Sequence, residues 1–562
     1  MNPPSCRRIV VIGGVAAGMK TACRLRRLDA TAEITVIDRS RDISYGACPL
    51  PYYIAGLYDD LSEVRRTPAG ALRDEGFFAN IKGFTALTGC EALRIDPDRR
   101  QVWLRRLDDG SEQVLAYDQL VLATGNEPIV PPLPGSDLDG VLPLKTMEQA
   151  ARIDTLVATA HSAVIVGGGL IGLEMAEALR LRGLQVTLLE MKDQVLASAL
   201  DFGMASLVHR ELRAKGVNLR LAEPVRRFEG QQGRVEAVIT DQGRYPADLA
   251  LIAIGVRPAV QLARDAGLEL GPTGAIAVNE QMQTSDPAIY AAGDCAEATD
   301  RLSDKKVYVP LGSTANKQGR VVANNLAGQT EAFAGILGSL AVKVFDLNVG
   351  RTGLSAEDAQ LIGLEPVSLV TASPDIAHLY PGNKPIVIKL TADRASRRLL
   401  GAQVVGSGVV DKRVDVVATA LTFGATIDQL ANIDLCYAPP YAGAMDALHQ
   451  AANALRNKLD GLADSLSAAA VQEKLASGEE LLLLDVRSPA EYDEVRLPGA
   501  TLLPLGVLRH KLAELPQDRL IVPFCKVSLR GFEAQLILQQ AGFTNVRYLE
   551  GGIAAWPYAL ER

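Results

Sequence analysis

The feature that most constrains this chain is a pair of similar glycine-rich turns, each between an apolar run and a helix-like stretch. They lie about 150 residues apart. Their glycines are Gly13, Gly14 and Gly18 in the first turn and Gly167, Gly169 and Gly172 in the second. A strand that passes through such a turn into a helix builds part of a parallel, doubly wound sheet. Two copies predict an α/β chain with two domains of the same type.

The second turn matches the pattern GxGxxG in full. The first glycine allows the tight turn, the next lets a pyrophosphate approach the backbone, and the third lets helix and strand pack closely. The helix N-terminus then faces the phosphates. Glu190 ends the following strand, predicted at 185–190, where a carboxylate bonds ribose hydroxyls and repels a 2′-phosphate. The sequence predicts a nicotinamide dinucleotide site that favours NADH, a preference that the nearby Lys192 softens.

The first turn departs from that pattern, because Val15 stands where the middle glycine belongs. Gly14 is then the expected point of close backbone approach. Asp38 ends the next predicted strand, 34–38, about 20 residues after Gly18, the spacing of a ribose-binding acid. Two dinucleotide sites in one chain imply one bound cofactor and one exchanging substrate.

Two further motifs complete a resemblance to the two-dinucleotide-domain flavoprotein disulfide reductases. One is the end of a buried strand, Ala123-Thr124-Gly125, and the other is the segment 284–294 with Gly293-Asp294. The resemblance implies FAD at the first turn, NADH or NADPH at the second, and Asp294 on the ribityl chain of FAD. The remaining cofactor contacts that it implies are Ala17, Arg39, Gly255 and Ala315.

Seven cysteines, an odd number without CxxC spacing or a histidine cluster, indicate neither a disulfide framework nor a metal site. Cys48 stands out because Pro49 follows it and suits the first position of a helix. A helix N-terminus and an oxidised flavin nearby would both favour the Cys48 thiolate. No second cysteine lies four residues away, so a dithiol couple is excluded. A single cysteine must cycle through a sulfenic acid, a mixed disulfide or a persulfide.

The segment 44–54 resembles the single-cysteine branch of the family: coenzyme A disulfide reductases, NADH oxidases and peroxidases, and NADH-dependent persulfide reductases. The oxidases and peroxidases carry a histidine where this chain has Ala16. The segment 12–27 is similar to the coenzyme A disulfide reductases. The resemblance therefore argues against an oxidase.

The same branch implies tyrosines and coenzyme A contacts. Tyr437, in Tyr-Ala-Pro-Pro-Tyr, resembles a residue that reaches across a homodimer to the active site, and Tyr380 resembles a second. Coenzyme A contacts are implied at Arg27, Ser44, Asn316 and Arg320. Two residues depart from the branch, since Ala47 stands for an asparagine and Met445 for a lysine. Coenzyme A as the thiol carrier is therefore an open question.

A different sulfur site is predicted at the C-terminal end. A strand ending at Cys525, a short loop and a helix give that sulfur a ring of backbone N–H groups, and Arg530 adds positive charge. Such a cradle stabilises a thiolate or a persulfide. This segment resembles a rhodanese domain, with an active loop at 525–530 and the usual ending at 551–556.

These features predict an α/β chain with two Rossmann-like domains, an α+β dimerisation domain and a rhodanese domain. The expected bounds are 1–145 with 271–330 for FAD, 146–270 for NAD(P)H, 331–455 for dimerisation, 456–475 for a linker and 476–562 for the rhodanese domain. A chain of 562 residues needs several cores. A net charge of −8 argues against nucleic acid, and the absence of a long apolar run or a signal peptide predicts a cytoplasmic protein that does not enter the membrane.

Three functions remain open. The first is an NADH-dependent reductase of persulfide, polysulfide or coenzyme A disulfide, in which electrons pass through FAD to Cys48 and Cys525 carries sulfane sulfur. The second is a sulfurtransferase whose flavoprotein part senses redox state. The third is an NADH oxidase. The fusion to a rhodanese domain favours the first, because plain disulfide reduction has no use for one.

Overall fold

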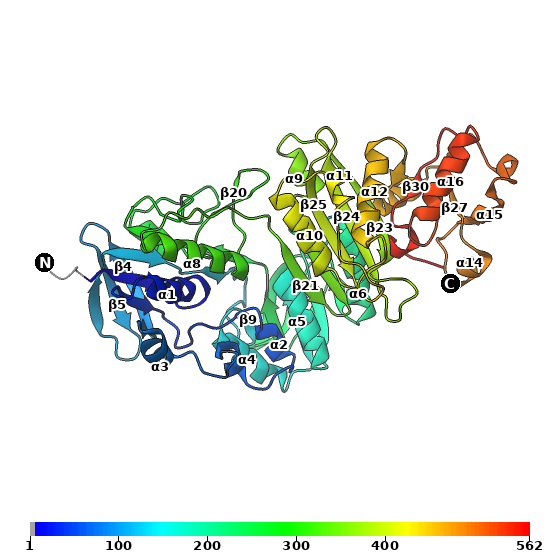
Figure 1. Cartoon of the computed structure of the whole chain (residues 1–562). Helices are drawn as coiled ribbons and strands as arrows, with labels where there is room; N and C mark the ends of the chain where they lie inside the picture. The colour runs from blue at the N-terminus through cyan, green and yellow to red at the C-terminus, as the bar shows by residue number, and fades with distance from the viewer. Residues whose placement is uncertain (1–5, 562) are drawn as a thin grey trace. The chain divides into compact units, whose positions relative to one another are not determined.

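The computed structural model describes residues 6–561, which form two compact units. One unit comprises the chain up to Gly167 together with Met175–Thr187 and Val225–Ile336. The other comprises Gly168–Glu174, Leu188–Pro224 and the chain from Leu337 onward. Helices alternate with strands in both (Figure 1), so the predicted α/β class is what the structure has.

A parallel sheet in the order β18-β7-β1-β2-β3 is the centre of the first unit. Its strands are β1 (Arg8–Ile12), β2 (Glu33–Ile37), β3 (Thr85–Leu87), β7 (Gln119–Leu122) and β18 (Ile289–Ala291). Val11 lies in register with Val36 on one side and Val121 on the other, and all three are buried. Buried β-branched strands are typical of a parallel sheet covered by helices. The strand predicted at 34–38 is shifted by one residue from the observed β2.

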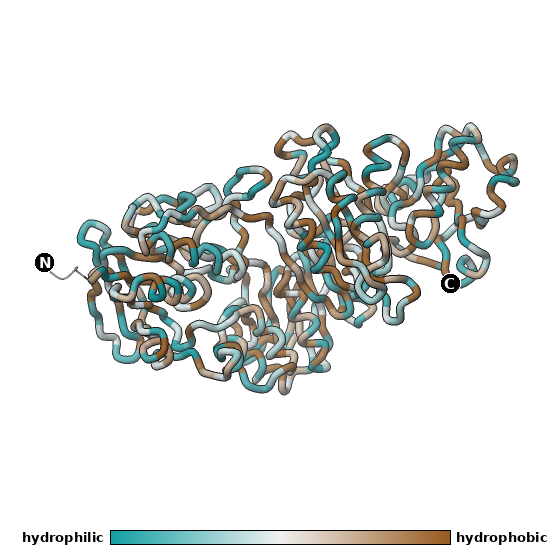
Figure 2. The backbone as a smooth tube through the Cα atoms, in the orientation of Figure 1, coloured by the Kyte–Doolittle hydropathy of each residue, from teal (hydrophilic) through white to brown (hydrophobic). Residues whose placement is uncertain are grey.

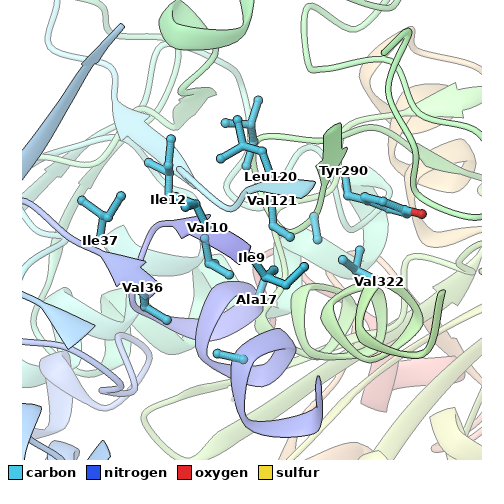
Figure 3. Close-up of a cluster of buried hydrophobic side chains, with 14 of the residues drawn as sticks. Ile9, Val10, Ile12, Ala17, Val36, Ile37, Leu120, Val121, Tyr290 and Val322 are labelled. Carbon is cyan, nitrogen blue, oxygen red and sulfur yellow. The ribbon is translucent and has the colours of Figure 1, made fainter. Parts of the chain in front are cut away.

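Helices α1 (Ala16–Leu28) and α8 (Gly312–Leu326) lie side by side in this unit. They approach closely because a Cβ at Gly319 would lie 2.5 Å from the Ala17 carbonyl oxygen. The Thr21 hydroxyl donates to the Gly319 carbonyl at 3.0 Å. Figure 3 shows Ala17 and Val322, one from each helix, in the same hydrophobic cluster as the strand residues Ile9 and Val121.

Smaller elements complete the first unit. Antiparallel ribbons join β4 (Cys90–Asp96), β5 (Gln101–Arg106) and β6 (Glu112–Ala116); β13 (Val225–Gln231), β14 (Arg234–Thr240) and β15 (Arg244–Pro246); β8 (Asn126–Pro128) and β17 (Val256–Pro258); and β19 (Ala298–Thr299) and β20 (Lys306–Val307). A parallel set joins β9 (Val141–Pro143), β16 (Leu249–Ile252) and β10 (Ser162–Val166). The short helices are α2 (Leu50–Ile54), η1 (Leu61–Arg65), α3 (Glu75–Phe77), η2 (Phe78–Lys82), α4 (Met147–Val157) and α7 (Gln261–Asp265).

Further along the chain come α5 (Leu170–Leu181), β11 (Gln185–Leu189), α6 (Phe202–Ala214) and β12 (Asn218–Arg220). The second unit contains an antiparallel sheet in the order β21-β22-β25-β24-β23. Its strands are β21 (Leu340–Val344), β22 (Leu347–Gly353), β23 (Pro366–Pro374), β24 (Pro385–Asp393) and β25 (Leu399–Gly406). Helix α10 (Asp411–Thr422) packs on β22 and β25, and α12 (Ala447–Leu459) packs on β23 and β24 (Figure 1). Two short helices, α9 (Ala356–Gln360) and α11 (Ile427–Leu430), complete this part.

The C-terminal part of the second unit has a parallel sheet in the order β28-β27-β29. Its strands are β27 (Leu481–Asp485), β28 (Thr501–Leu502) and β29 (Leu520–Phe524), and β26 (Ser465–Leu466) pairs with β30 (Tyr548–Leu549). Its helices are α13 (Ala468–Ala476), α14 (Pro489–Glu494), α15 (Leu505–Leu508), η3 (Leu512–Glu514), α16 (Leu529–Gln540) and η4 (Gly552–Ala555). The segment 456–475, expected to be a linker, contains the end of α12 and most of α13.

Hydrophobic stretches alternate with hydrophilic ones along the whole chain, as the brown and teal segments of Figure 2 show. Among residues 6–561, no helix combines the length and the apolar character that crossing a bilayer requires.

Candidate functional site

The first glycine turn is possible only without side chains. Gly13 has φ +113°, and a Cβ there would lie 2.0 Å from the Ala123 carbonyl oxygen. A Cβ at Gly18 would lie 1.8 Å from the Gly13 carbonyl oxygen. Both positions therefore require glycine, the first for its left-handed backbone and the second for close packing of α1 on the turn. The sequence analysis expected a tight turn at the first glycine and close packing at the last, and Gly13 and Gly18 have this geometry.

An acid closes each of the two glycine turns in the same way. The Asp38 carboxylate accepts hydrogen bonds from the Gly14 N–H at 2.6 Å and the Ser40 N–H at 2.7 Å. The Glu190 carboxylate accepts from the Gly168 N–H at 2.6 Å and the Lys192 N–H at 2.8 Å. Both glycine turns thus have the same local arrangement, in which a carboxylate after the next strand accepts from a backbone N–H of the turn. Burial raises the pKa of Asp38 above its ordinary value, although these two N–H groups oppose that shift.

Asp294 lies among polar groups that the sequence did not reveal. The Asn126 side-chain amide donates to its carboxylate at 2.7 Å, and burial raises the pKa of Asp294. The Lys145 ammonium interacts electrostatically with Asp294, Asp38 and Arg39, and burial lowers the pKa of Lys145. A single sequence gives no signal for Lys145, because it lies outside every motif, just before α4.

Another buried polar group near Asp294 is the Tyr308 hydroxyl. It has no hydrogen-bond partner within residues 6–561. Burial first, and then the Asp294 and Cys295 side chains, raise the pKa of this phenol. A buried hydroxyl of this kind generally has a partner, so a bound polar molecule is a natural one.

The helix N-termini in this unit fit a dinucleotide. Val15 precedes α1 and Leu311 precedes α8, and neither residue has a polar side chain that could cap the first-turn N–H groups. Those donors are then free for phosphate or ring oxygens of a ligand. Together with the two half-buried carboxylates of Asp38 and Asp294 for hydroxyl groups, this donor and acceptor set fits FAD at the first turn.

Three other residues predicted to contact FAD, Ala17, Gly293 and Ala315, lie close together in space. A Cβ at Gly293 would lie 3.0 Å from the Ala17 Cβ and 3.5 Å from the Ala315 Cβ. The Thr124 hydroxyl donates to the Ala259 carbonyl at 2.6 Å, and Gly125 has φ +72°.

The corresponding glycines near β10 and β16 also have left-handed backbones. Gly167 has φ +111°, with the Ala253 carbonyl oxygen only 2.4 Å from a Cβ there, and Gly255 has φ +114°. Of the predicted nicotinamide residues, Gly169 comes directly before α5 and Gly172 is its third residue.

Cys48 lies on an exposed loop of the first unit that is held from several sides. The Ser44 N–H donates to the Gly14 carbonyl at 2.7 Å, which ties the loop to the glycine turn. The Tyr58 hydroxyl donates to the Pro49 carbonyl at 2.5 Å, directly after the cysteine. Pro49 caps α2 rather than occupying its first position as predicted, a difference of one residue. Because α2 has only five residues, its dipole at Cys48 is smaller than that of a long helix.

The residues predicted to contact coenzyme A lie partly on solvent-exposed faces. Arg27, Asn316 and Arg320 are exposed on α1 and α8, which lie side by side. Ser44 is half-buried in the Cys48 loop, and Ala47 is exposed next to the cysteine.

Tyr380 and Tyr437 lie on two exposed loops of the second unit that are tied together. The Ala377 N–H donates to the Pro439 carbonyl at 3.2 Å. Beneath them the Arg413 guanidinium, only 1% exposed, donates to the Asp446 carboxylate at 2.7 Å and also to the Asp375 carbonyl. One buried cation thus joins both loops, and nothing in the sequence singled it out.

Cys525 lies between a strand and a helix, as the sequence predicted. Cys525 follows β29 directly and is 1% exposed, and α16 begins four residues later at Leu529. The helix therefore starts inside the predicted loop 525–530. Its N-cap residue, Ser528, has φ +107°, an unusual value for a residue with a side chain.

Arg530 is paired more closely than the sequence suggested. Its guanidinium donates to both oxygens of the Glu491 carboxylate, at 2.8 and 2.7 Å. The Arg530 pKa is raised chiefly by Glu491 and also by the Cys525 side chain. The same pairing holds the pKa of Glu491 at about 2.

Three family models cover most of this chain. Residues 7–319 match the pyridine nucleotide-disulphide oxidoreductases, residues 340–449 match the dimerisation domain of that family, and residues 467–558 match the rhodanese-like domain.

Solved structures match the chain over almost its full length. An NAD-dependent persulfide reductase from A. fulgidus is 43% identical, with a TM-score of 0.93, and the match covers 98% of this chain and 100% of that one. Reduced CoADR-RHD from Bacillus anthracis is 34% identical, with a TM-score of 0.90 over 99% and 98% of the two chains.

Curated relatives match about four-fifths of the chain. An NADH oxidase from Methanocaldococcus jannaschii is 38% identical, and the match covers 80% of this chain and 99% of that protein. An NAD(P)H coenzyme A polysulfide/persulfide reductase from Pyrococcus horikoshii is 35% identical over 80% and 98%. The chain therefore belongs to the pyridine nucleotide-disulphide oxidoreductase family and carries a rhodanese-like domain at its C-terminal end.

Proposed function

We propose that this protein reduces persulfide, polysulfide or coenzyme A disulfide at Cys48 with electrons from NAD(P)H, and that Cys525 carries sulfane sulfur for that reaction. The family uses FAD and NAD(P)H. Bound FAD supplies a two-electron relay between the nicotinamide and a sulfur substrate. The residues that would hold it are Asp38, Asp294 and the backbone of the first glycine turn, and Asn126 holds the Asp294 carboxylate in place.

One combination carries the proposal: Cys48, an exposed cysteine with no second cysteine close by in the sequence, and a cysteine-bearing rhodanese-like segment are part of the same chain. Residue 52, four positions after Cys48, is tyrosine, so no internal dithiol can form there. Relatives of the same full length include a protein named as a persulfide reductase. A sulfur-transfer domain is useful to a reductase whose substrate carries sulfane sulfur.

The proposed reaction at Cys48 balances as follows. The Cys48 thiolate attacks the inner sulfur of a persulfide RSSH, the S–S bond breaks, and HS⁻ leaves. A mixed disulfide, Cys48–S–S–R, remains. Two electrons from NADH and one proton then release RSH and restore the Cys48 thiolate. The sum is RSSH + NADH + H⁺ → RSH + H₂S + NAD⁺.

Coenzyme A is our preferred thiol R. Arg27 and Arg320 are exposed cations on neighbouring helices, and guanidinium groups suit phosphates. Ala47 and Met445 lack the polar groups that the family usually offers near the sulfur. A smaller thiol such as cysteine or glutathione persulfide is therefore the alternative carrier.

A homodimer is part of the proposal. The segment 340–449 matches a dimerisation domain, and it exposes large apolar side chains. They include Leu379, Tyr437, Tyr441 and Met445. A second copy of the chain would cover them, and would bring Tyr437 and Tyr380 to an active site as hydrogen-bond donors.

The test uses purified holoenzyme, NADH and glutathione persulfide under anaerobic conditions, with sulfide release as the readout. Cys48→Ser should lose sulfide release by more than about a hundredfold, as expected when a nucleophile is removed. Cys436→Ser, which changes another exposed cysteine, should release sulfide at the rate of the unmodified protein. Undiminished release by Cys48→Ser would overturn the role of Cys48.

An NADH oxidase is the second candidate, because the M. jannaschii relative carries that name. Ala16, where oxidases have histidine, argues against it. Rapid NADH loss in air without any sulfur compound would favour the oxidase.

Thiosulfate-to-cyanide transfer that depends on Cys525, with negligible NADH turnover on every sulfur compound, would favour a sulfurtransferase with a redox-sensing flavoprotein part.

A further inference from the structure

Glu550 is a buried acid next to the Cys525 site that the proposed reaction does not use. It lies directly after β30 and is only 5% exposed. A buried carboxylate is costly unless it is paired and hydrogen-bonded. Its partners therefore indicate what it does.

Those partners come from outside the sheet that carries Cys525. The Val370 N–H of β23 donates to one Glu550 oxygen at 3.1 Å. The Lys458 ammonium of α12 donates to the other at 2.7 Å, and the Ser465 hydroxyl donates to the same oxygen at 2.7 Å. Lys458 also donates to the Ser368 carbonyl at 3.1 Å. Glu550 is thus fixed to the sheet β21–β25 and to the helix that packs on it.

The residues that follow Glu550 hold the active loop from behind. The Gly551 N–H donates to the Ser528 hydroxyl oxygen at 2.6 Å. The Ile553 N–H donates to the Cys525 carbonyl at 3.0 Å, and the Ala554 N–H donates to the Lys526 carbonyl at 3.0 Å. A Cβ at Gly552 would lie 2.3 Å from the Cys525 carbonyl oxygen, so the two segments touch at backbone distance.

Ser528 shows that the loop is strained as well as held. Its φ of +107° is unfavourable for a residue with a side chain. Such a conformation persists only where its surroundings enforce it. The hydrogen bond from the Gly551 N–H to the Ser528 hydroxyl holds Ser528 directly in this conformation.

We propose that Glu550 is a positioning residue that couples the Cys525 loop to the antiparallel sheet β21–β25. Its carboxylate fixes 551–554, and that segment fixes the loop in the conformation that buries the Cys525 sulfur. Loosening the contact of Glu550 with β23 and α12 therefore opens the loop. The consequence for sulfur transfer rests on the proposed function, whereas the opening of the loop does not.

The test measures how fast iodoacetamide alkylates Cys525 in the full-length holoenzyme, by mass analysis of its peptide. Glu550→Gln keeps the shape and removes the charge, and it should raise that rate roughly tenfold or more, since a hydrogen bond to a buried charge is lost. Glu561→Gln, which removes a surface carboxylate paired with Arg496, is the matched control and should change the rate less than about twofold.

Lys458→Gln tests the coupling from outside the rhodanese-like segment and remains available if Glu550→Gln does not fold. It should also raise alkylation of Cys525 roughly tenfold, because Glu550 loses its cation. Unchanged alkylation in Lys458→Gln, or in a folded Glu550→Gln protein, would overturn the coupling. Sulfur transfer from thiosulfate to cyanide is measured in parallel. If the unmodified protein transfers no sulfur, the proposed role of Cys525 as a sulfur carrier fails, and the alkylation rates still decide the coupling.

Ser528 gives a readout that a merely structural role would not produce. Ser528→Ala removes the acceptor of the Gly551 N–H and keeps the strained backbone, whereas Ser528→Gly removes the same acceptor and relieves the strain. The loop should therefore be opened more by alanine than by glycine, with alkylation at least about threefold faster in Ser528→Ala. The reverse order would show that the loop is not held under strain.

Discussion

The Glu491 carboxylate accepts two hydrogen bonds from the Arg530 guanidinium, at 2.8 and 2.7 Å, and so joins the end of the Cys525 loop to helix α14. Glu491 also accepts from the Ser488 hydroxyl at 3.1 Å in a capping box at the start of that helix. One acid therefore serves both the helix and the loop. The positive charge that the sequence assigned to the sulfur site is therefore shared with this acid.

This ion pair predicts an acid-dependent stability. The pKa of Glu491 is about 2 in the folded chain and 4.5 ordinarily, so the folded state binds fewer protons between those values. The pairing stabilises the fold above about pH 4.5 and is lost as the pH falls towards 2. The difference in thermal midpoint between the unmodified protein and Glu491→Gln should shrink over that interval. A difference that stays constant from pH 6 to pH 3 would contradict the pairing.

Glycine-to-alanine changes in α1 and α6 should have opposite effects on stability. Gly18→Ala places a Cβ 1.8 Å from the Gly13 carbonyl, so it should lower the thermal midpoint and the flavin content of the purified protein. Gly203, in α6, has open space at its Cβ, and Gly203→Ala should stabilise the chain by up to about 1 kcal/mol through helix propensity. Equal effects of the two changes on the thermal midpoint would show that the close approach at Gly18 is absent.

Glu190 predicts the choice of nicotinamide cofactor. Its carboxylate is held by the Gly168 and Lys192 N–H groups. The proposed assignment puts it beside the cofactor ribose, where it would repel a 2′-phosphate. Glu190→Gln should raise the ratio of kcat/KM for NADPH to kcat/KM for NADH roughly tenfold, the factor that corresponds to ~1.4 kcal/mol of lost repulsion. Steady-state rates with the two cofactors and one sulfur substrate measure it. An unchanged ratio would mean that Glu190 does not face the ribose.

The buried pair of Arg413 and Asp446 predicts a large stability effect. Removing one partner of a buried ion pair costs about 3–5 kcal/mol, because the other charge stays buried. Arg413→Met should therefore shift urea unfolding by that amount, and it should speed proteolysis of the loops that carry Tyr380 and Tyr437. A loss below ~1 kcal/mol would indicate that these loops are held elsewhere.

The sequence pattern was sufficient to predict those elements whose conformation depends on residues close to one another in the chain. The strand β1, the glycine turn after it and Asp38 all belong to one short stretch, in which φ angles and side-chain alternation are dictated by neighbours. The same holds for β29, Cys525 and α16. The predicted and observed bounds there differ by one or two residues, as fraying ends do.

Contacts between distant residues could not be predicted in this way. Glu550 bonds to Val370, 180 positions earlier, and Asn126 bonds to Asp294, 168 positions later. Such pairs depend on how sheets pack, which no periodicity in one sequence encodes. Lys145 was missed for the same reason, since its importance comes only from the carboxylates that surround it in space.

In the proposed reaction, Cys48 forms a covalent adduct with the substrate thiol. The direct measurement incubates the protein anaerobically with coenzyme A disulfide, without NADH, and then analyses the mass of the Cys48 peptide. A coenzyme A adduct should form on Cys48 and should disappear when NADH is added. A Cys48 peptide that gains no mass, or an adduct that NADH leaves in place, would contradict the proposed reaction.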